Sequence, residues 1–589
     1  MCYVVAKGGD FPGLSQDVID KCIGFRGPDL KGIATVNNLT ILQGLLSTTP
    51  PFTPQPIESS RYIFAFNGQF YGYIDNGNFI RRPYGVSDGL MFLSLVEDVG
   101  LTSAINCVIG AFSCVLFDKE SGFTYLFRDR HGEKPLFLYR DEKRFLASSS
   151  MKIFSPKYSD LELDLNLDSL KTYFKFGHPG SNKFLFNQVI SVPTMAVLVI
   201  KKTDDRYSYH VEDLKFSKID EFSEEKFFEV VNAVLPQIPY SISLSDGIDS
   251  TYVLSHVGKN DENVNCIHFR QSQRSQDNVE INCRKMGVKA IFFDERDESF
   301  SEYFLTQLND LFSYPYGDFS AALALKTGSL CASTGRRVLV TGDGGDELLS
   351  EYRRNNYAQL LYTIWKAPFL RKVFIFLIEN IFVDRIIGQL PLFKHRCRKI
   401  QLALQAENEK KFLAHISGLS FVDFDTYGAF DELVNGLEGK SITDKTSSLD
   451  ELFYLPNDIC PKYDGACMLN SVENRSPLLQ ALKAFKQTHL EGLRNLGKGK
   501  AFFQRRIKDL GLVTTGIKEG FGFSVESFLS DSKVFIELEG FSELSEIMSI
   551  FGENKLPKTV DDWSVLAKQD PYLVWFCLVY DKWKKDFFE

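Results

Sequence analysis

The sequence predicts two parts of different fold class: a layered, β-rich part, followed by a parallel α/β sheet that continues into a mostly helical region. The first 200 residues contain short apolar segments separated by turns. From about Phe222, apolar strands alternate with helix-like stretches and end in turns rich in Gly, Ser and Asp. The chain has 589 residues, more than one hydrophobic core holds, so we expect at least two domains.

The expected strands follow from these apolar segments. In the first part they are YIFAFNGQFYGY, GAFSCVLFD, FTYLFRDR, PLFLYR and MAVLVI; in the second, they lie in YSISLSDGIDSTYVLSHV, VNCIHF and RRVLVTGDGGDELL. Parallel strands place their carboxyl ends at one edge of the sheet, so a binding site is expected there. The charged stretch KKTDDRYSYHVEDLKFSKIDEFSEEK is interpreted as a linker, and the chain past Leu349 as mostly helical.

Composition excludes several classes of function. Hydrophobic residues make up 44% and charged residues 24%, as in ordinary globular proteins, and the net charge of −9 without a basic run argues against a nucleic-acid partner. Eleven scattered cysteines without a CxxC pair indicate a reducing cytoplasm rather than zinc or disulfides. No signal peptide is expected.

The most apolar stretch is VFIFLIENIFV, residues 373–383. Glu379 interrupts it, and it is shorter than the ~18 apolar residues that a membrane span needs. We interpret it as a buried amphipathic helix and expect no membrane partner.

Cys2 is the first candidate catalytic residue. If the initiator Met is removed, Cys2 carries a thiol and a free α-amine. An α-amine titrates near ~7.7–8, so part of it is neutral at cell pH and accepts the thiol proton. Nucleophile and base would then belong to one residue.

An acyl-enzyme mechanism also needs hydrogen-bond donors for the developing oxyanion. FNGQF offers Asn67 and Gly68, which we expect in a turn between two apolar strands. Taken alone, Asn-Gly is more often a simple hairpin turn.

A second candidate site follows the strand that ends in SLSDGIDST. Ser245, Gly247, Ser250 and Thr251 supply hydroxyls and backbone N–H groups suited to phosphate, although a simple helix cap is the alternative. Asp249 repels bare phosphate and is therefore predicted to bind magnesium.

VTGDGGDELL ends a further strand of the same sheet. It places Asp343 and Asp346 where the same Mg²⁺ and pyrophosphate are within reach; an acidic helix start is the alternative interpretation.

The ordered motifs resemble the asparagine synthetase family over nearly the whole chain. Cys2, RGPD, FNGQFYGY, VSDG and RDRHGEKPLF match its glutamine amidotransferase domain. SLSDGIDST and VTGDGGDELL match its pyrophosphate-binding motifs, and YGDFSAALA, YLPNDICPKYDGACMLNSVENRSPLL, GKGKAFFQRR, IKEGFGFSVESFL and YLVWFCLVYDKWKKDF complete the family order.

The resemblance implies a role for each matching residue. Cys2 would be nucleophile and base, Asn67 and Gly68 the oxyanion hole, and Asp88 and Gln69 glutamine-binding residues. ATP would contact Leu244, Ser245, Gly247, Asp249, Ser250, Ile267, Thr341, Gly342 and Asp343. Asp249 and Asp346 would bind Mg²⁺, and Lys518 would stabilise charge at the reacting phosphorus.

The implied fold is an α+β N-terminal nucleophile hydrolase domain with stacked β-sheets between helices, residues 2–215. An α/β ATP-pyrophosphatase domain with a parallel sheet and a helical C-terminal part, residues 216–589, follows it. The implied reaction uses ATP, Mg²⁺, glutamine and a small carboxylic acid: an acyl adenylate forms, and ammonia from the Cys2 site displaces AMP. A homodimer is left open.

Five positions depart from the family pattern. Tyr3 replaces a Gly, Leu45 an Arg that clamps the glutamine carboxylate, Gln69 a Glu, Asp246 a Gly, and Gln480 an Asp. Arg26, Arg61, Arg81 and Arg82 are candidates to replace the missing cation.

Three interpretations follow. The first is a glutamine-dependent amidotransferase acting on aspartate or another small carboxylic acid. The second is an ATP-dependent synthetase that joins a different amine, as in lactam or peptide cyclisation, and has a degenerate glutaminase site. The third is a non-catalytic regulatory or scaffold protein, which the joint presence of Cys2, Asp249, Asp346 and Lys518 disfavours.

Overall fold

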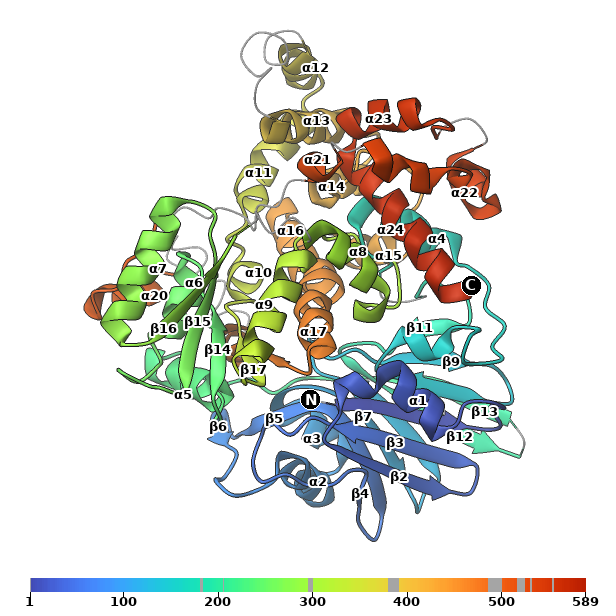
Figure 1. The fold of residues 1–589 in the computed structure, drawn as a ribbon, viewed down its shortest axis with the longest axis vertical. Coiled ribbons are helices and arrows are strands. Elements are labelled where there is room, and N and C mark those ends of the chain that lie inside the picture. The colour runs from blue at the N-terminus through green and yellow to red at the C-terminus, as the bar shows by residue number, and fades with distance from the viewer. Residues whose placement is uncertain are drawn as a thin grey trace.

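The computed structural model describes residues 2–180, 184–204, 206–294, 300–379, 391–485, 500–515, 525–529, 532–552 and 556–589. Two antiparallel sheets come first, and a parallel sheet with a large helical region follows (Figure 1). The predicted succession of two fold classes is confirmed.

Two sheets make up the first part, and their described pairings are antiparallel. The first sheet has the order β11-β9-β10-β1-β3-β2. Its strands are β1 (Cys2–Gly8), β2 (Leu30–Val36), β3 (Leu39–Leu45), β9 (Phe137–Arg140), β10 (Phe145–Ser148) and β11 (Val189–Ser191). The second has the order β13-β12-β8-β7-β5-β4, with β6 paired to β5. Its strands are β4 (Ile57–Glu58), β5 (Tyr62–Asp75), β6 (Asn78–Arg81), β7 (Val108–Asp118), β8 (Phe123–Arg128), β12 (Ala196–Thr203) and β13 (Arg206–Asp213).

Alternation along the strands stacks these sheets between helices. Val4 of β1 and Ile63 of β5 face a common core between the sheets. Val5 faces the opposite way, toward α1 (Gln16–Ile23) and α4 (Leu167–Phe176). Phe64 faces α2 (Asp88–Val99) and α3 (Leu101–Cys107). The resulting four layers confirm the predicted fold of the first part.

Two local predictions for this part are wrong. The stretch interpreted as a linker contains β13, which pairs with β12 over eight residues. It forms an edge strand because its two Tyr residues and its Val alternate with Ser, His and Glu. Asn67 and Gly68 lie inside β5 rather than in a turn between two strands, because β5 continues in register with β7 through both residues.

The parallel sheet of the second part has the order β16-β15-β14-β17-β18. Its strands are β14 (Tyr240–Ser243), β15 (Val264–Phe269), β16 (Lys289–Phe293), β17 (Val338–Val340) and β18 (Glu473–Arg475). One face packs against α5 (Glu224–Val234), α6 (Ile248–Leu254), α7 (Gln273–Met286) and α20 (Ala501–Asp509). The other packs against α9 (Ala321–Ser333) and α17 (Cys460–Leu469).

Helices dominate the rest of the chain that the structure describes. They are α8 (Phe300–Leu311), α10 (Gly345–Leu349), α11 (Arg353–Lys366), α12 (Pro368–Leu377), α13 (Pro391–Gln405), α14 (Glu409–Ser417), α15 (Ala429–Gly436), α16 (Ile442–Leu449), α18 (Pro477–Ala484), α21 (Val525–Phe528), α22 (Ser545–Phe551), α23 (Val560–Gln569) and α24 (Pro571–Phe588), with a π-helical segment at Asp450–Ile459. Helix α24 buries Trp575 and Trp583 in a core shared with α4 of the first part.

The prediction for residues 373–383 is right about the helix where α12 covers them but wrong about burial. Helix α12 covers the first of these residues, and none of its side chains is buried; residues 380–383 lie outside the described residues. Within the described ranges, no helix is both long and apolar enough to cross a bilayer.

Candidate active sites

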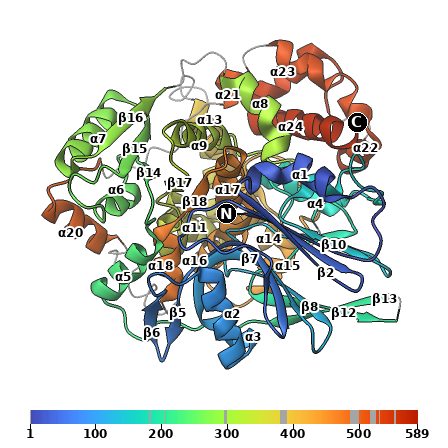
Figure 2. The same cartoon turned by 60° about the horizontal axis from the view of Figure 1, so that its bottom comes forward.

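Cys2 begins β1 at the boundary between the two parts. The N-terminal end of the chain lies next to α17 in both views (Figures 1 and 2). The Cys2 side chain is buried, and burial raises the pKa of its thiol, while hydrogen bonds to Leu46 and Gln43 lower it. The net shift is upward, so the thiol is mostly protonated near neutral pH and needs a base in order to react.

The side-chain amide of Asn67 contacts the backbone of Cys2 through its oxygen and leaves its nitrogen as a hydrogen-bond donor. The Cys2 N–H donates to Asn67 Oδ1 at 3.1 Å. Asn67 Nδ2 is buried and has no hydrogen-bond partner among the described residues. An unpaired buried donor is costly unless a ligand completes it. Asn67 therefore presents an N–H group for an anion close to Cys2.

Gly68 follows with a φ of 135°, a conformation that favours glycine. A Cβ at this position would lie 2.0 Å from the carbonyl oxygen of Ala111 in β7. Only glycine fits there, so β5 passes tightly against β7 at this residue.

A pocket of about 350 Å³, including its mouth, lies beside Cys2 and Gly68. Its lining includes Cys2, Leu45, Gly68, Gln69 and Asp88. Leu45 pairs directly with Cys2 in the β1–β3 register. The apolar residue that replaces the expected Arg thus faces the pocket next to the nucleophile.

Asp88 begins α2 at the edge of the pocket. Burial raises the pKa of its carboxyl group, and the opposing influences are the N–H groups of Phe70 and Gly89 and the charge of Arg82. Because these two N–H groups hold the Asp88 carboxyl group at the pocket lining, it can contact a cationic group of a ligand.

The four candidate cations differ in position. Arg26 is buried in an ion pair with Asp464 of α17 at 2.6 Å, Arg61 pairs with Asp118 at 2.9 Å, and Arg81 is exposed. Arg82 donates to the carbonyl oxygens of Pro50 and Val86, each of which adjoins a pocket-lining residue. Arg82 is therefore the best placed of the four to reach the pocket.

Gln69 connects the pocket to the second part of the chain. Its Nε2 donates to Thr48 Oγ1 and to Glu473 Oε2 of β18, both at 2.9 Å. Burial by itself raises the pKa of Glu473, but Arg475 at 2.5 Å and the hydrogen bonds lower it to about 2. The Glu473 carboxylate is therefore charged, and it lies against the Gln69 side chain.

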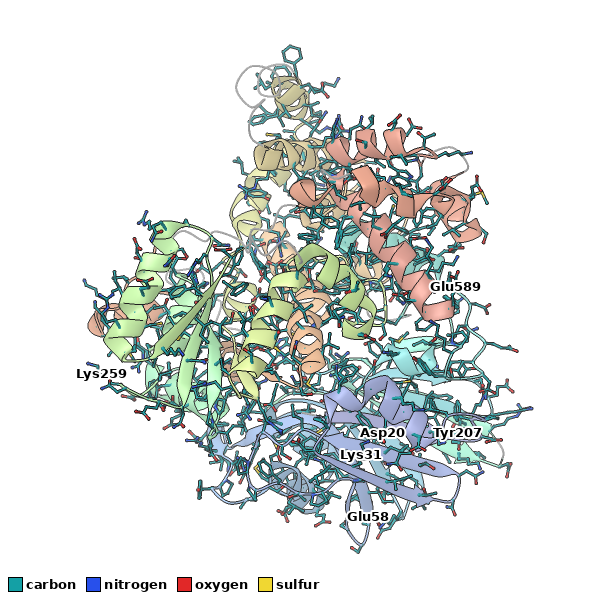
Figure 3. All side chains as sticks on the ribbon, viewed as in Figure 1. Asp20, Lys31, Glu58, Tyr207, Lys259 and Glu589 are labelled. Atoms are coloured by element: carbon teal, nitrogen blue, oxygen red, sulfur yellow. The ribbon has the colours of Figure 1, made fainter. Side chains whose placement is uncertain are left out.

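Two other departures from the family pattern have partners. Tyr3 donates a 2.5 Å hydrogen bond to Asp20 of α1, and its ring fills the space over Gly44, the residue opposite in β3. Asp20 also pairs with Lys31 of β2 at 2.7 Å (Figure 3). Gln480 donates to Glu133, across the boundary between the two parts.

The second site lies at the carboxyl ends of β14 and β17. After β14, Ser245 and Ser250 hydroxyls lie 2.9 Å apart, and the N–H of Gly247 donates to Ser245 Oγ. After β17, Gly342 packs so closely that a Cβ would lie 2.9 Å from the Ser250 nitrogen. The two predicted phosphate-binding turns are thus in contact.

Asp249 and Asp346 converge on one cation. Lys500 Nζ lies 2.7 Å from Asp249 Oδ2 and 2.5 Å from Asp346 Oδ1. Asp249 Oδ1 is buried without a hydrogen-bond partner among the described residues. Two carboxylates with a free oxygen fit Mg²⁺, which takes one or two carboxylates and completes its shell with phosphate and water.

The remaining predicted nucleotide residues surround these loops. Leu244 N–H donates to the carbonyl of Ile267, which lies near the carboxyl end of β15. Thr341 N–H donates to the carbonyl of Arg475, the residue whose side chain pairs with Glu473. Lys518 lies outside the described residues.

Sequence reasoning missed Glu473, Arg475 and Lys500. The motifs that contain them, SVENRSPLL and GKGKAFFQRR, were recognised, but their contacts join residues 404, 426 and 251 positions apart. No local pattern encodes such pairings.

Family models match both parts. A glutamine amidotransferase domain matches residues 11–210, and an asparagine synthase domain matches residues 229–481. The chain belongs to the asparagine synthetase family. It is a divergent member of these ATP-dependent, glutamine-hydrolysing ligases.

Curated relatives agree with this membership. A Methanocaldococcus jannaschii protein provisionally named asparagine synthetase [glutamine-hydrolyzing] 2 is 24% identical over 60% of this chain and 76% of its own length. Human asparagine synthetase [glutamine-hydrolyzing] is 30% identical over 26% of this chain and 28% of its own. A solved structure of glutamine phosphoribosylpyrophosphate amidotransferase from B. subtilis aligns with 58% of this chain and 81% of its own at 10% identity, with a TM-score of 0.26.

Proposed function

We propose that this family member hydrolyses glutamine at Cys2, activates a small carboxylic acid as an acyl adenylate with ATP, and amidates it with the ammonia released. The observation that carries the proposal is the pair of complementary sites: an orphaned Asn67 donor near Cys2, and two carboxylates that enclose a cation beside contacting phosphate-binding turns. Aspartate is one candidate acceptor.

Residues of the first site supply each element of amide hydrolysis. After removal of the initiator Met, the Cys2 nitrogen that now donates to Asn67 is the α-amine, and it accepts the thiol proton. The thiolate attacks the glutamine amide carbon, and Asn67 Nδ2 and the Gly68 N–H stabilise the oxyanion. Ammonia leaves, and water hydrolyses the thioester to glutamate. Asp88 holds the substrate ammonium.

The second site positions ATP for attack by the acceptor carboxylate. Ser245, Gly247 and Ser250 bind the pyrophosphate portion, and Leu244, Ile267, Thr341, Gly342 and Asp343 adjoin the nucleotide. Asp249 and Asp346 would hold Mg²⁺, which offsets negative charge as pyrophosphate leaves. Lys518 is assigned the role of stabilising negative charge at the reacting phosphorus. We place the domain boundary between residues 215 and 216.

A panel of carboxylic acids with ATP, Mg²⁺ and ammonium tests the proposal. At least one acid should yield AMP and pyrophosphate in equal amounts together with its amide. ADP and phosphate as products would exclude the acyl adenylate.

Leu45 favours a second candidate function. An apolar side chain where the carboxylate clamp is expected weakens glutamine binding, so an amine other than ammonia is the alternative nitrogen donor. Adding primary amines and amino acids to the panel separates the two: the alternative predicts an N-substituted product and no glutamate from glutamine.

Arg82→Ala should raise the KM for glutamine. Loss of a charge-assisted contact to a carboxylate costs ~2–5 kcal/mol, so a rise of about tenfold or more is expected, with a smaller change in kcat. Arg81→Ala, on the adjacent exposed residue, is the matched control. An unchanged glutamine KM in Arg82→Ala would show that Arg82 does not bind the glutamine carboxylate. Leu45→Arg should tighten glutamine binding both in the wild type and in Arg82→Ala.

Gln69 lines the pocket, and Gln69→Glu should impair glutamine hydrolysis. It places a second carboxylate against Glu473, and like charges in a buried site cost about 3 kcal/mol, equivalent to ~10²-fold in kcat/KM. Combining it with Glu473→Gln restores one carboxylate and one amide and should recover most of the activity. Gln188→Glu, beside Asp164 at the surface, is the control. Failure of the double variant to recover, although folded, would contradict this role.

A further inference from the structure

Helix α12 shows its apolar residues to solvent. Phe369 is 77% exposed and Phe376 60% exposed, and Leu370, Val373 and Phe374 are exposed as well. Exposed single apolar residues are common, but a contiguous group on one short helix is not. This feature needs an explanation that the two active sites do not provide.

One face of α12 presents apolar side chains to solvent. Phe369, Val373 and Phe376 follow the i, i+4, i+7 spacing of one helix face, and all three are exposed. Arg371 and Ile375, on the opposite face, are only half-exposed. This face therefore points away from the protein, while Ile375 and Ile378 on the other side are half-buried.

Positive charge accompanies this face. Lys366, Arg371 and Lys372 lie between residues 366 and 378, a span with no Asp or Glu, in a chain whose net charge is −9. Lys366 Nζ lies 5.0 Å from the ring of Trp365, the last aromatic residue before α12. Exposed Phe residues with flanking Lys and Arg are the composition of helices that lie in a membrane interface.

The position of α12 suits contact with a broad surface. It projects from the end of the molecule opposite the N-terminal sheets (Figure 1). A surface that meets this tip leaves the Cys2 end of the protein facing the solvent. It also differs from a membrane span, since α12 has ten residues.

We propose that α12 docks the protein onto an anionic lipid surface. Phe369, Val373 and Phe376 insert among the acyl chains next to the headgroups, and Lys366 and Lys372 contact the lipid phosphates. A second copy of the chain fits less well, because a stable interface takes 20–30 residues a side and the same cations on both copies would repel.

Vesicle co-sedimentation of the full-length protein tests the proposal. Binding should be at least about tenfold stronger to phosphatidylcholine vesicles that contain phosphatidylglycerol than to phosphatidylcholine alone, and should fall with added salt. The double variant Phe369→Ser/Phe376→Ser and the single variant Lys372→Glu should each lose most of this binding. Val211→Ser/Val565→Ser, which removes two apolar side chains that are more than half exposed elsewhere, should retain it.

Three outcomes would overturn the proposal. They are equal binding to both vesicle types or to neither, equal binding by the α12 variants and the control, and self-association of the wild type without lipid that Phe369→Ser/Phe376→Ser abolishes. The last result, read by sedimentation velocity, would assign α12 to a second copy of the chain. Because the variants change exposed residues, their thermal unfolding should match that of the wild type.

Discussion

Cys2→Ala should abolish glutamine-dependent amide synthesis and leave ammonia-dependent synthesis largely intact. Nucleophile and base both belong to Cys2, whereas the nucleotide loops follow β14 and β17 of the parallel sheet. Loss of a catalytic nucleophile removes ~10⁴-fold or more of the rate. Glutamate release from glutamine and pyrophosphate release with ammonium, measured on the same preparation, check the two halves separately.

Cys107→Ala is the matched control, since Cys107 lies on α3 away from the pocket lining and should change neither activity. Protein that retains its initiator Met should behave like Cys2→Ala. Equal loss of both activities in folded Cys2→Ala would show that Cys2 does not act as assigned.

Asp249→Asn and Asp346→Asn should each stop pyrophosphate release with either nitrogen source. Each removes one negative charge from the pair that encloses Lys500 and changes the shape little. We expect losses on the order of 10²-fold or more in rate, from several kcal/mol of lost transition-state stabilisation. Both variants should keep glutaminase activity.

Mn²⁺ binding in the presence of a non-hydrolysable ATP analogue gives a second reading that does not depend on turnover. It should weaken in both variants and not in Asp277→Asn, which changes an exposed carboxylate on α7. Turnover and Mn²⁺ affinity equal to the wild type would exclude these two residues as metal ligands.

The sequence predicted the layers, the strand-end loops and the residues in them, because each depends on local signals. Apolar alternation identified the strands, and Gly, Ser and Asp at their ends identified the turns that bring Ser250 and Gly342 together. Leu45 pairs with Cys2 in the β1–β3 register, and its correspondence to the family's Arg stays a prediction.

Contacts between the two parts could not be predicted in this way. Glu473 lies beneath Gln69 and Lys500 lies between Asp249 and Asp346 only because β18 and α20 return to the sheet late in the chain. Apolar composition also misled: residues 373–383 were expected to be buried, but hydrophobicity does not specify whether protein or another apolar phase covers a helix. Asn-Gly suggested a turn, but the glycine serves a close approach of β5 to Ala111.

The origin of the product nitrogen tests the central claim most directly. The wild-type protein is given ATP, an acceptor acid from the panel, glutamine labelled with ¹⁵N in its side-chain amide, and an excess of unlabelled ammonium, and the product is weighed by mass spectrometry. Ammonia that passes from Cys2 to the adenylate inside the protein predicts a mostly ¹⁵N-labelled amide. An unlabelled amide, or a product that contains a different amine, would contradict glutamine-dependent amidation by this chain.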